Sequence, residues 1–267
     1  MYNITYDNWL LNEQLCDSEA LKQFSSVEKV FLCEGERVVQ DKISEVIRFK
    51  SSKKTYYIKR YTAAGRKTVG FFRKSRICSE WENLVSLTKI GLPVPKIIAH
   101  GEKKRNGRFL AGALITEGVE NSVNLAQHLS DNADLISDKK WLYSVIDQVA
   151  GYVHDMHAHK FIHRDLNLRN VLVQTQGYPA VFFIDCPVGG FQSGFYLKRS
   201  IIRDLAHLDK VARYILSDRD LLRFYKKYKK TDKLTSADKR LISKIRHFHD
   251  KHRSKQNRKI DEPYRVL

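Results

Sequence analysis

Three stretches between residues 27 and 61 alternate apolar and polar residues roughly one by one. They are VEKVFL at 27–32, ISEVIRFK at 43–50 and KTYYIKRY at 54–61, and polar residues separate each from the next. Alternation with a period of two is typical of strands with one buried face. This part of the chain is therefore predicted to form an antiparallel meander.

The apolar spacing changes to that of a helix after residue 76. Within residues 76–90 apolar side chains recur every three or four positions, and Gly91 and Pro93 are expected to end the helix. The stretch GRFLAGALITEGV at 107–119 then predicts a buried strand that ends at Glu117.

Beyond Gly118 the pattern becomes mainly helical. Residues 141–160 have helical spacing, and residues 170–185 read as a strand hairpin with its turn at Gly177 and Pro179. We therefore expect an α+β chain with two lobes. Residues 1–118 are expected to form an antiparallel sheet with one main helix, and residues 119–267 a mainly helical lobe.

Composition narrows the class of protein. The 267 residues are 42% hydrophobic, enough for a sizeable core, and the four cysteines form no CxxC pair. The N-terminus lacks a signal-peptide pattern and no apolar run can span a bilayer, so a soluble or peripheral cytoplasmic protein is expected. Its 48 Lys and Arg against 30 Asp and Glu predict an anionic partner: nucleic acid, an acidic membrane or a charged substrate.

The segment HRDLNLRN at 163–170 matches the pattern His-Arg-Asp-Leu-x-x-x-Asn of kinase catalytic loops. Five fixed positions arise by chance in such a chain with odds on the order of 10⁻⁴. In that chemistry an Asp reaches the acceptor hydroxyl, and an Asn five residues later holds a magnesium ion that bridges the phosphates. Asp165 is therefore the predicted base and Asn170 a predicted metal ligand. A polar turn before a hairpin is the alternative.

Three further residues fit the same chemistry. Asp185 ends the apolar strand AVFFID after the hairpin, as the second metal carboxylate of a kinase does, although an Asp there can also be a turn former. Lys59 lies in YYIKRY, where kinases have the lysine that contacts nucleotide phosphates; a solvated lysine is the alternative. Its ion-pair partner is expected on the next helix, at Glu80 or Glu82, and we favour Glu80.

Two segments carry weaker signals. CEGERVVQDK at 33–42 offers only Gly35 for a loop that covers a nucleotide, and a turn without a ligand explains it equally well. Four histidines lie within residues 154–163, but their spacing lacks a closed ligand set for zinc. A helix end that runs into the catalytic loop explains them better.

The glycine-poor first lobe and the segments SEWENLVSLTKIGLPVPKIIAHG, VHDMHAHKFIHRDLNLRNVLV, FFIDCP and RDLAHLDKVAR together resemble bacterial lipopolysaccharide core kinases. That family phosphorylates Kdo or heptose sugars, and the resemblance covers most of the chain from about Val27 onward. It implies ATP and Mg²⁺ as cofactors, and a lipopolysaccharide core or related anionic glycolipid as acceptor at the cytoplasmic face of the inner membrane. It also supports Glu80, and it implies backbone contacts to adenine at Glu117 to Val119.

The sequence argues against a peptide as the phosphate acceptor. Only 18 residues separate Asp185 from Asp204 and none reads Ala-Pro-Glu, so the peptide-docking segment of protein kinases is expected to be absent. Asp204 is expected either to buttress the catalytic loop or to cap a helix. Pro187 follows Cys186 where protein kinases have Phe-Gly, and because proline fixes φ near about −65° we expect a stiffer segment.

Two other functions stay open. One is a different small-molecule or protein kinase of the same superfamily; an antibiotic kinase would be expected to line its site with acids, whereas this chain is rich in Lys and Arg. The other is a catalytically silent binding module, which the complete set of motif residues disfavours. The sequence does not identify the sugar or the hydroxyl.

The C-terminal region, residues 226–259, is strongly basic, with 14 Lys or Arg and three Asp. Thr235 and Asp238 resemble a capping pair, and apolar residues follow at helical spacing, so an amphipathic helix is predicted. We expect its basic face to contact an anionic membrane surface, and no nucleic acid, because no binding motif accompanies the charge. A core-packed helix with merely solvated charges is the alternative.

Overall fold

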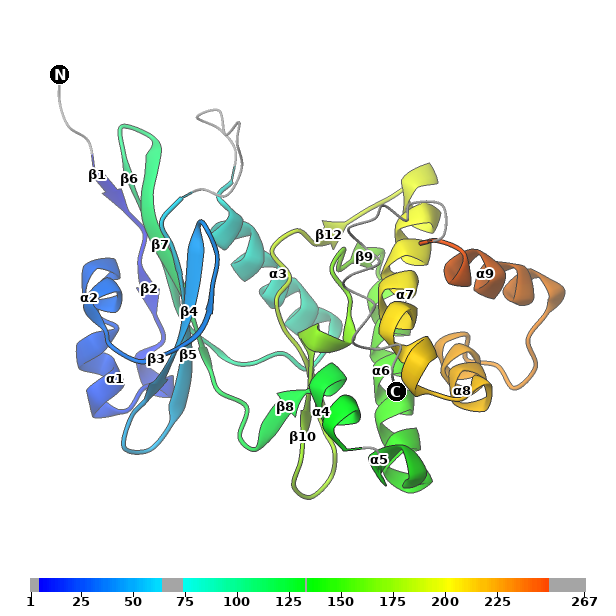
Figure 1. The fold of residues 1–267 in the computed structure, drawn as a ribbon. Coiled ribbons are helices and arrows are strands. Elements are labelled where there is room, and N and C mark those ends of the chain that lie inside the picture. The colour runs from blue at the N-terminus through cyan, green and yellow to red at the C-terminus, as the bar shows by residue number, and fades with distance from the viewer. Residues whose placement is uncertain (1–4, 64–73, 133, 250–267) are drawn as a thin grey trace. The chain divides into compact units, whose positions relative to one another are not determined.

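The computed structural model describes residues 5–63, 74–132 and 134–249 (Figure 1). The chain divides into two compact units, one of residues 1–85 and 95–120 and the other of residues 86–94 and 121–267. The division therefore falls after Glu120, and a short stretch around the end of helix α3 (Arg76–Ile90) belongs to the second unit. Each unit has its own sheet and helices, described in turn below.

The first unit is built on an antiparallel sheet. Its strand order is β1-β6-β7-β5-β4-β3, and β2 pairs with β6. The strands are β1 Thr5–Asp7, β2 Leu10–Leu11, β3 Glu36–Gln40, β4 Ser44–Lys50, β5 Thr55–Tyr61, β6 Ile97–Arg105 and β7 Arg108–Glu117. The strands predicted at 43–50, 54–61 and 107–119 are confirmed, and so is the α+β class.

The first of the three predicted strands is wrong. Residues 27–32 form helix α2 (Val27–Leu32), which begins where the Ser26 side chain accepts a hydrogen bond from the Lys29 amide at 3.3 Å. Val27 and Val30 lie one turn apart and are both buried, whereas Leu32 is 80% exposed. A run this short fits either period, and the serine cap and the packing of the two valines favour the helix.

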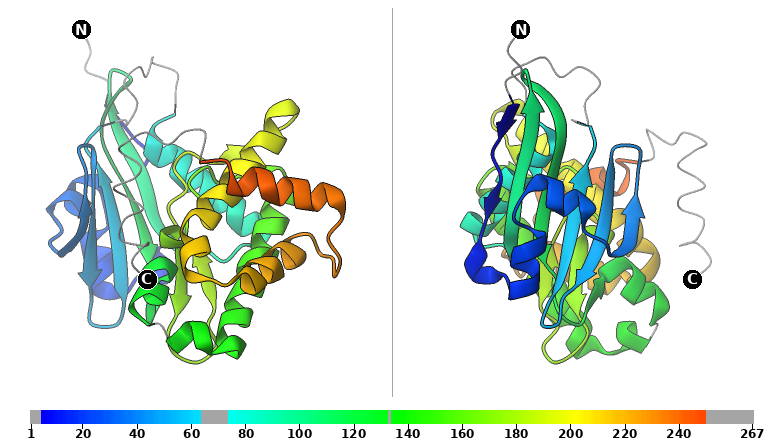
Figure 2. Two further views of the ribbon diagram at one scale, coloured as in Figure 1. Left: turned by 45° about the vertical axis from the view of Figure 1, so that its right-hand side comes forward. Right: turned by 90° about the vertical axis from the view of Figure 1, so that its left-hand side faces the viewer.

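The other helices of the first unit are η1 (Glu13–Leu15), α1 (Ser18–Gln23) and the first part of α3 (Arg76–Ile90). α3 confirms the helix predicted there, and Gly91 follows it with φ +92°, a left-handed conformation that glycine tolerates. α1 and α2 cover one face of the sheet (Figure 2, right), and Phe24, Tyr56 and Ile58 pack together in that core.

Strand β5 shows how the alternating pattern sorts side chains between the two faces of this sheet. Tyr56 and Ile58 point into the core under α1 and α2. Lys59 and Tyr61 lie on the opposite face, where both contact Glu80 of α3. The period of two therefore places Lys59 on the face of the sheet where it meets Glu80 of α3.

The second unit is mainly helical. It contains β8 Ser122–Asn124, α4 Leu125–Asp131, α5 Asp134–Ser137, α6 Lys139–Ala158, β9 Phe161–Ile162, η2 Leu168–Asn170, β10 Val171–Gln174, β11 Val181–Phe183, β12 Gly190–Phe191, α7 Phe195–Ile215, α8 Asp218–Tyr228 and α9 Ser236–Arg246. The strands form two small sheets, β11-β10-β8 and β12-β9. The predicted helix at 141–160 and the hairpin with its turn at Gly177 are confirmed.

The basic C-terminal region is not one helix. Residues 226–228 are the end of α8, a turn follows, and α9 begins at Ser236 with the predicted Thr235–Asp238 capping box. Ile245 is fully buried and Leu241 partly buried, so α9 is amphipathic as expected. Residues 250–259 of the predicted segment lie outside the described residues.

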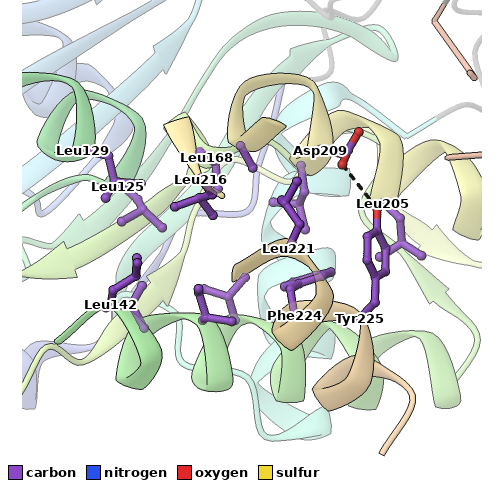
Figure 3. A pocket seen from close by; sticks show the side chains of 15 residues that line it. Leu125, Leu129, Leu142, Leu168, Leu205, Asp209, Leu216, Leu221, Phe224 and Tyr225 are labelled. Carbon is purple, nitrogen blue, oxygen red and sulfur yellow. Dashed lines mark hydrogen bonds between the residues drawn. The ribbon is translucent and has the colours of Figure 1, made fainter. Parts of the chain in front are cut away.

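Helices α4, α6, α7 and α8 enclose the apolar core of the second unit. Leucines from all four helices, among them Leu129, Leu142, Leu205 and Leu221, line a cavity of about 50 Å³ (Figure 3). Asp209 and Tyr225 also line it, and the Tyr225 hydroxyl donates a hydrogen bond of 3.3 Å to Asp209. Burial, reinforced by this carboxylate, raises the pKa of Tyr225, so its hydroxyl stays protonated.

Among the described residues, no helix has both the length and the apolar character needed to cross a bilayer.

We expect Leu142→Ala to lower the free energy of unfolding by about 2–5 kcal/mol, because it enlarges a cavity that the surrounding helices cannot close. Leu142 is 1% exposed, whereas Leu222 on α8 is 43% exposed. Leu222→Ala is the matched control and should cost much less. Urea unfolding of both variants gives the comparison, and equal losses would contradict this account of the core.

Candidate active site

The face of the first sheet opposite α1 and α2 carries a buried charged cluster. Nζ of Lys59 lies 2.8 Å from Oε1 of Glu80, and the Tyr61 hydroxyl donates to Oε2 of the same carboxylate at 2.6 Å. Glu80 is 3% exposed. Burial, together with the negative charge of Glu80, raises the pKa of Tyr61, so the hydroxyl remains a donor. Both carboxylate oxygens are thereby fixed, and the position of the lysine with them.

The structure distinguishes the two glutamates that the sequence left open. Glu82 is two residues further along α3 and pairs with Lys74 at 2.6 Å, at a site where the lysine side chain is 63% exposed. Tyr61 was not predicted as part of this cluster, although its place two residues after Lys59 put it on the same face of the strand. Glu80 is therefore the partner of Lys59.

Arg60, between Lys59 and Tyr61, has a different role from the surface cations near it. It is 6% exposed, donates to Oε1 of Glu45 at 3.1 Å, and also donates to the carbonyl oxygen of Cys33. It thus joins β5 to β4 and to the end of α2.

The end of β7 is held by backbone and side-chain contacts. The amide N–H of Glu117 donates to the carbonyl oxygen of Lys96 at 2.9 Å, and that of Gly118 donates to the carbonyl oxygen of Thr55 at 2.7 Å. Burial alone would raise the pKa of Glu117, but its ion pairs with Lys54 and Lys96 lower it. These two N–H groups belong to the sheet, so adenine contacts at Glu117 to Val119 stay a prediction.

Gly35 has a packing reason to be glycine. It lies just before β3, and a Cβ there would be 2.7 Å from the carbonyl oxygen of Arg48. The turn that joins β3 to β4 is formed by residues 41–43 instead, where the Asp41 carboxylate accepts from the amides of Ile43 and Ser44. A nucleotide contact at Gly35 stays a prediction.

In the second unit the catalytic-loop motif forms a rigid turn around an exposed carboxylate. Asn167 donates through its side-chain amide to Oδ1 of Asp165 at 3.1 Å, and Asn170 donates to Oδ2 at 3.2 Å. The two amides hold both oxygens while Asp165 itself is exposed. Asn167 was not predicted; its side-chain oxygen also accepts from the Arg169 amide at the start of η2.

A buried carboxylate supports this loop from the other side. Asp204, in the middle of α7, is fully buried and accepts from the amides of His163 and Arg164 at 2.7 and 2.9 Å. The buttress role is therefore confirmed, and a helix-cap role is excluded by its position. Arg164 has φ +67°, which costs energy for a residue with a side chain, and the two bonds to Asp204 hold it there.

Asp185 follows β11 and is tied to the same loop. The amide of Ile184 donates to the carbonyl oxygen of Asn170 at 3.0 Å, so the residue before Asp185 is bonded to the other predicted metal ligand. Asp185 is exposed and has φ +64°. Next to it, Cys186 is fully buried, and its thiol contacts the His163 carbonyl at 3.7 Å.

These residues offer oxygen ligands of the kind that Mg²⁺ takes. Magnesium is commonly held by one or two carboxylates plus substrate phosphates, so a cage of protein ligands is not needed. Asn170 donates through its amide nitrogen to Asp165, so its side-chain oxygen is the atom that can coordinate a metal, and the Asp185 carboxylate is the second oxygen donor of the set. The donor set therefore fits the metal.

The histidines before the loop have separate partners. His154 contacts the carbonyl oxygen of Tyr228 at 2.7 Å, and His157 contacts the hydroxyl of the same tyrosine at 2.9 Å. Burial lowers the pKa of His163, despite nearby carboxylates, so its ring is neutral. Within the part of the chain that the structure describes, no three His, Cys, Asp or Glu side chains converge as metal ligands. His154 and His157 therefore tie α6 to α8.

The antiparallel sheet with its Lys59–Glu80 pair and the helical unit with its Asp165 loop are the two parts of a protein-kinase-like fold. A solved structure described as WaaP in complex with acyl carrier protein matches 91% of this chain and 98% of its own length, with a TM-score of 0.71 and 20% identity. The family model for the lipopolysaccharide kinase (Kdo/WaaP) family matches residues 30–228. The chain belongs to that family.

Curated relatives of the chain are named 3-deoxy-D-manno-octulosonic acid kinase. The protein from Actinobacillus succinogenes is 29% identical over 54% of this chain, and that from Mannheimia succiniciproducens is 31% identical over 42%. A third, from Pasteurella multocida, is 29% identical over 38%. The matched segments span 60%, 43% and 39% of those relatives' own lengths.

We expect Glu80→Gln to lower the free energy of unfolding by about 1–3 kcal/mol. The glutamine amide carries no charge, so Lys59 would lose the negative partner of its buried ion pair. Glu82→Gln on the same helix is the matched control and should change the free energy of unfolding by about 0.5 kcal/mol or less. Chemical denaturation of the two variants measures the difference. A Glu82 variant as unstable as the Glu80 variant would contradict the assignment.

Proposed function

We propose that this protein transfers the γ-phosphoryl group of ATP to a hydroxyl of a Kdo or heptose sugar in the inner core of lipopolysaccharide. The observation that carries the proposal is the exposed Asp165 carboxylate, fixed through both oxygens by Asn167 and Asn170 on a loop anchored at Asp204. Family membership supports it.

The chemistry requires one proton acceptor and several positive charges. The sugar oxygen forms a bond to the γ-phosphorus, the bond to the bridging oxygen of ADP breaks, and Asp165 accepts the hydroxyl proton. Lys59, held by Glu80, would contact the nucleotide phosphates. Mg²⁺, held by Asn170 and Asp185, would neutralise charge on the phosphates when bound.

The segment between Asp185 and Asp204 favours a compact acceptor over a peptide. It contains only the two-residue strand β12, a turn and the first residues of α7. The formal charge of +18 favours an anionic acceptor, such as a sugar with a carboxylate or phosphate. A silent binding module is disfavoured because all the predicted residues are present, and Lys59 and Asp165 are each held by side-chain contacts, to Glu80 and to the two asparagines of the loop.

ATP turnover with Kdo-containing and heptose-containing acceptors tests the proposal, with an aminoglycoside and a generic protein as controls. We expect phosphate transfer to one of the sugars, and Asp165→Ala should reduce it by about 10²–10⁴-fold because the proton acceptor is lost. A Tyr178→Gln variant, altered in the exposed hairpin turn, should keep wild-type turnover. Unchanged turnover in a folded Asp165→Ala variant would remove this residue from the mechanism.

Asp185→Asn is expected to weaken magnesium-dependent use of ATP, because an amide lacks the charge that holds the ion. The shape of the side chain is preserved, so the strained turn should persist. Titration of ATP at several magnesium concentrations measures the effect. Wild-type magnesium dependence in this variant would refute the ligand assignment.

We also propose that α9 faces an anionic membrane. The cations at the end of α8 are poor candidates for this contact, because Lys227 pairs with Asp147, Lys229 with Asp238 and Lys230 with Asp155 at 3.0–3.3 Å. Those pairs hold α8 against α6 and α9. Three exposed cations of α9 lie within one side of the helix: Lys239 and Arg240 are adjacent, and Lys244 follows Arg240 by one turn.

A triple variant with glutamine at positions 239, 240 and 244 should bind anionic vesicles more weakly at low salt, since each well-placed cation can contribute about 1 kcal/mol. High salt should remove the difference by screening the charges. Co-sedimentation with vesicles measures both. Equal binding by the variant and the wild type at low salt would refute the role of α9.

A further inference from the structure

The segment between the Asp185 turn and the middle of α7 exposes an unusual amount of aromatic surface. Phe195 is 87% exposed, Tyr196 69% and Phe191 63%, and Val188 nearby is 37% exposed. Most soluble proteins expose large apolar side chains singly, so four within nine residues require an explanation. They all belong to β12, the turns beside it and the first turn of α7, which follow one another in the second unit (Figure 1).

The backbone beneath these side chains is fixed. β12 pairs with β9, the amide of Gln192 donates to the Lys160 carbonyl at 2.8 Å, and the ring of Phe191 packs edge-on against buried Phe161 at 5.2 Å. The rings of Phe195 and Tyr196 also contact each other, 6.1 Å apart. The fold therefore holds the aromatic side chains outward.

The charged residues within this stretch of the chain have one sign. Residues 186–203 contain no Asp or Glu, while Lys198 and Arg199 are exposed on the turn of α7 that follows Tyr196. Aromatic rings beside cations are the composition that binds the boundary between lipid headgroups and acyl chains: phenylalanine enters the apolar layer, tyrosine lies at headgroup depth and the cations meet lipid phosphates.

We propose that this aromatic-basic surface, formed by Val188, Phe191, Phe195, Tyr196, Lys198 and Arg199, inserts into the interface of an anionic bilayer. The inference rests on the proposed function, because an acceptor carried by a glycolipid is reached at a membrane. The aromatic-basic surface enters the apolar layer of the bilayer, whereas the cations of α9 are proposed to act through charge alone.

The position of the surface in the fold relates it to catalysis. Ile162 of β9, which pairs with Gly190, immediately precedes His163 and the catalytic loop. A contact that holds β12 and the start of α7 on a bilayer therefore also holds the loop that carries Asp165. A lipid-linked sugar would then be presented to that loop at the depth of the headgroups.

Charge argues for a bilayer and against a second copy of the chain as the occupant. If this surface met the same surface of another copy, Lys198 and Arg199 of both copies would come together without an acid from residues 186–203 to pair with them. An anionic bilayer provides both the apolar layer and the opposite charge.

The test compares wild type with the double variant Phe195→Gln/Tyr196→Gln on vesicles of phosphatidylglycerol and phosphatidylethanolamine. At high salt the charge attraction is screened, so the remaining binding reports apolar insertion. Loss of two inserted aromatic rings should weaken the partition by roughly tenfold or more. Tyr178→Gln, which removes an exposed aromatic ring from the β10–β11 turn of the same unit, should bind as wild type does.

A second variant, Tyr196→Trp, keeps an aromatic ring at the surface and reports its depth. Its added fluorescence should be quenched by lipids brominated on the acyl chains, above the quenching of the wild type. Thermal unfolding of each variant checks that the protein is folded.

Equal high-salt partition by wild type and the folded double variant, or no added quenching in the Tyr196→Trp variant, overturns the proposal. So does a loss of self-association on gel filtration without a loss of vesicle binding, which would assign the surface to a second copy. Turnover of the wild type on acceptors is measured separately. A protein that inserts through Phe195 but transfers no phosphate would refute the proposed function and leave this inference standing.

Discussion

The hydrogen bonds between Asp204 and the backbone before Asp165 are the constraint on which the second unit depends. A carboxylate with no exposure is costly unless its oxygens are satisfied, and here the amides of His163 and Arg164 and the nearby ring of His157 surround it. In return, Arg164 is held at a positive φ that a free chain would rarely adopt. The strained turn directs the next residue, Asp165, to the surface as an exposed carboxylate.

The first unit also relies on a buried carboxylate, whose partners are a lysine and a tyrosine hydroxyl in place of backbone amides. The Glu80 carboxylate is buried between Lys59 and the Tyr61 hydroxyl, so the lysine cannot move away without leaving a buried charge unpaired. In both units a buried carboxylate fixes the group that is proposed to act on phosphate or on a proton. The stability of each unit and the precision of its chemistry therefore rest on the same contacts.

The positive charge of the chain is divided among different tasks. Arg60 is buried and joins strands to α2, and Lys227 and Lys230 fasten α8 to α6 through Asp147 and Asp155. Other cations, among them those of α9 and of the start of α7, are exposed and can meet an anionic partner. Net charge alone predicted such a partner, but it did not show which cations were available.

The sequence by itself determined the catalytic-loop motif, the strands at 43–50 and 54–61, the helix at 76–90 and the capping box at Thr235, because local spacing and caps act over a few residues. It did not decide between Glu80 and Glu82, since both lie on one helix and only packing against β5 selects one. It also misassigned residues 27–32, where a short run fits two periods and tertiary burial of Val27 and Val30 favours the helix. The role of Asp204, the contact of Asn167 with Asp165 and the outward aromatic side chains of α7 were decided by the tertiary structure, because each depends on contacts or exposure that local spacing does not encode.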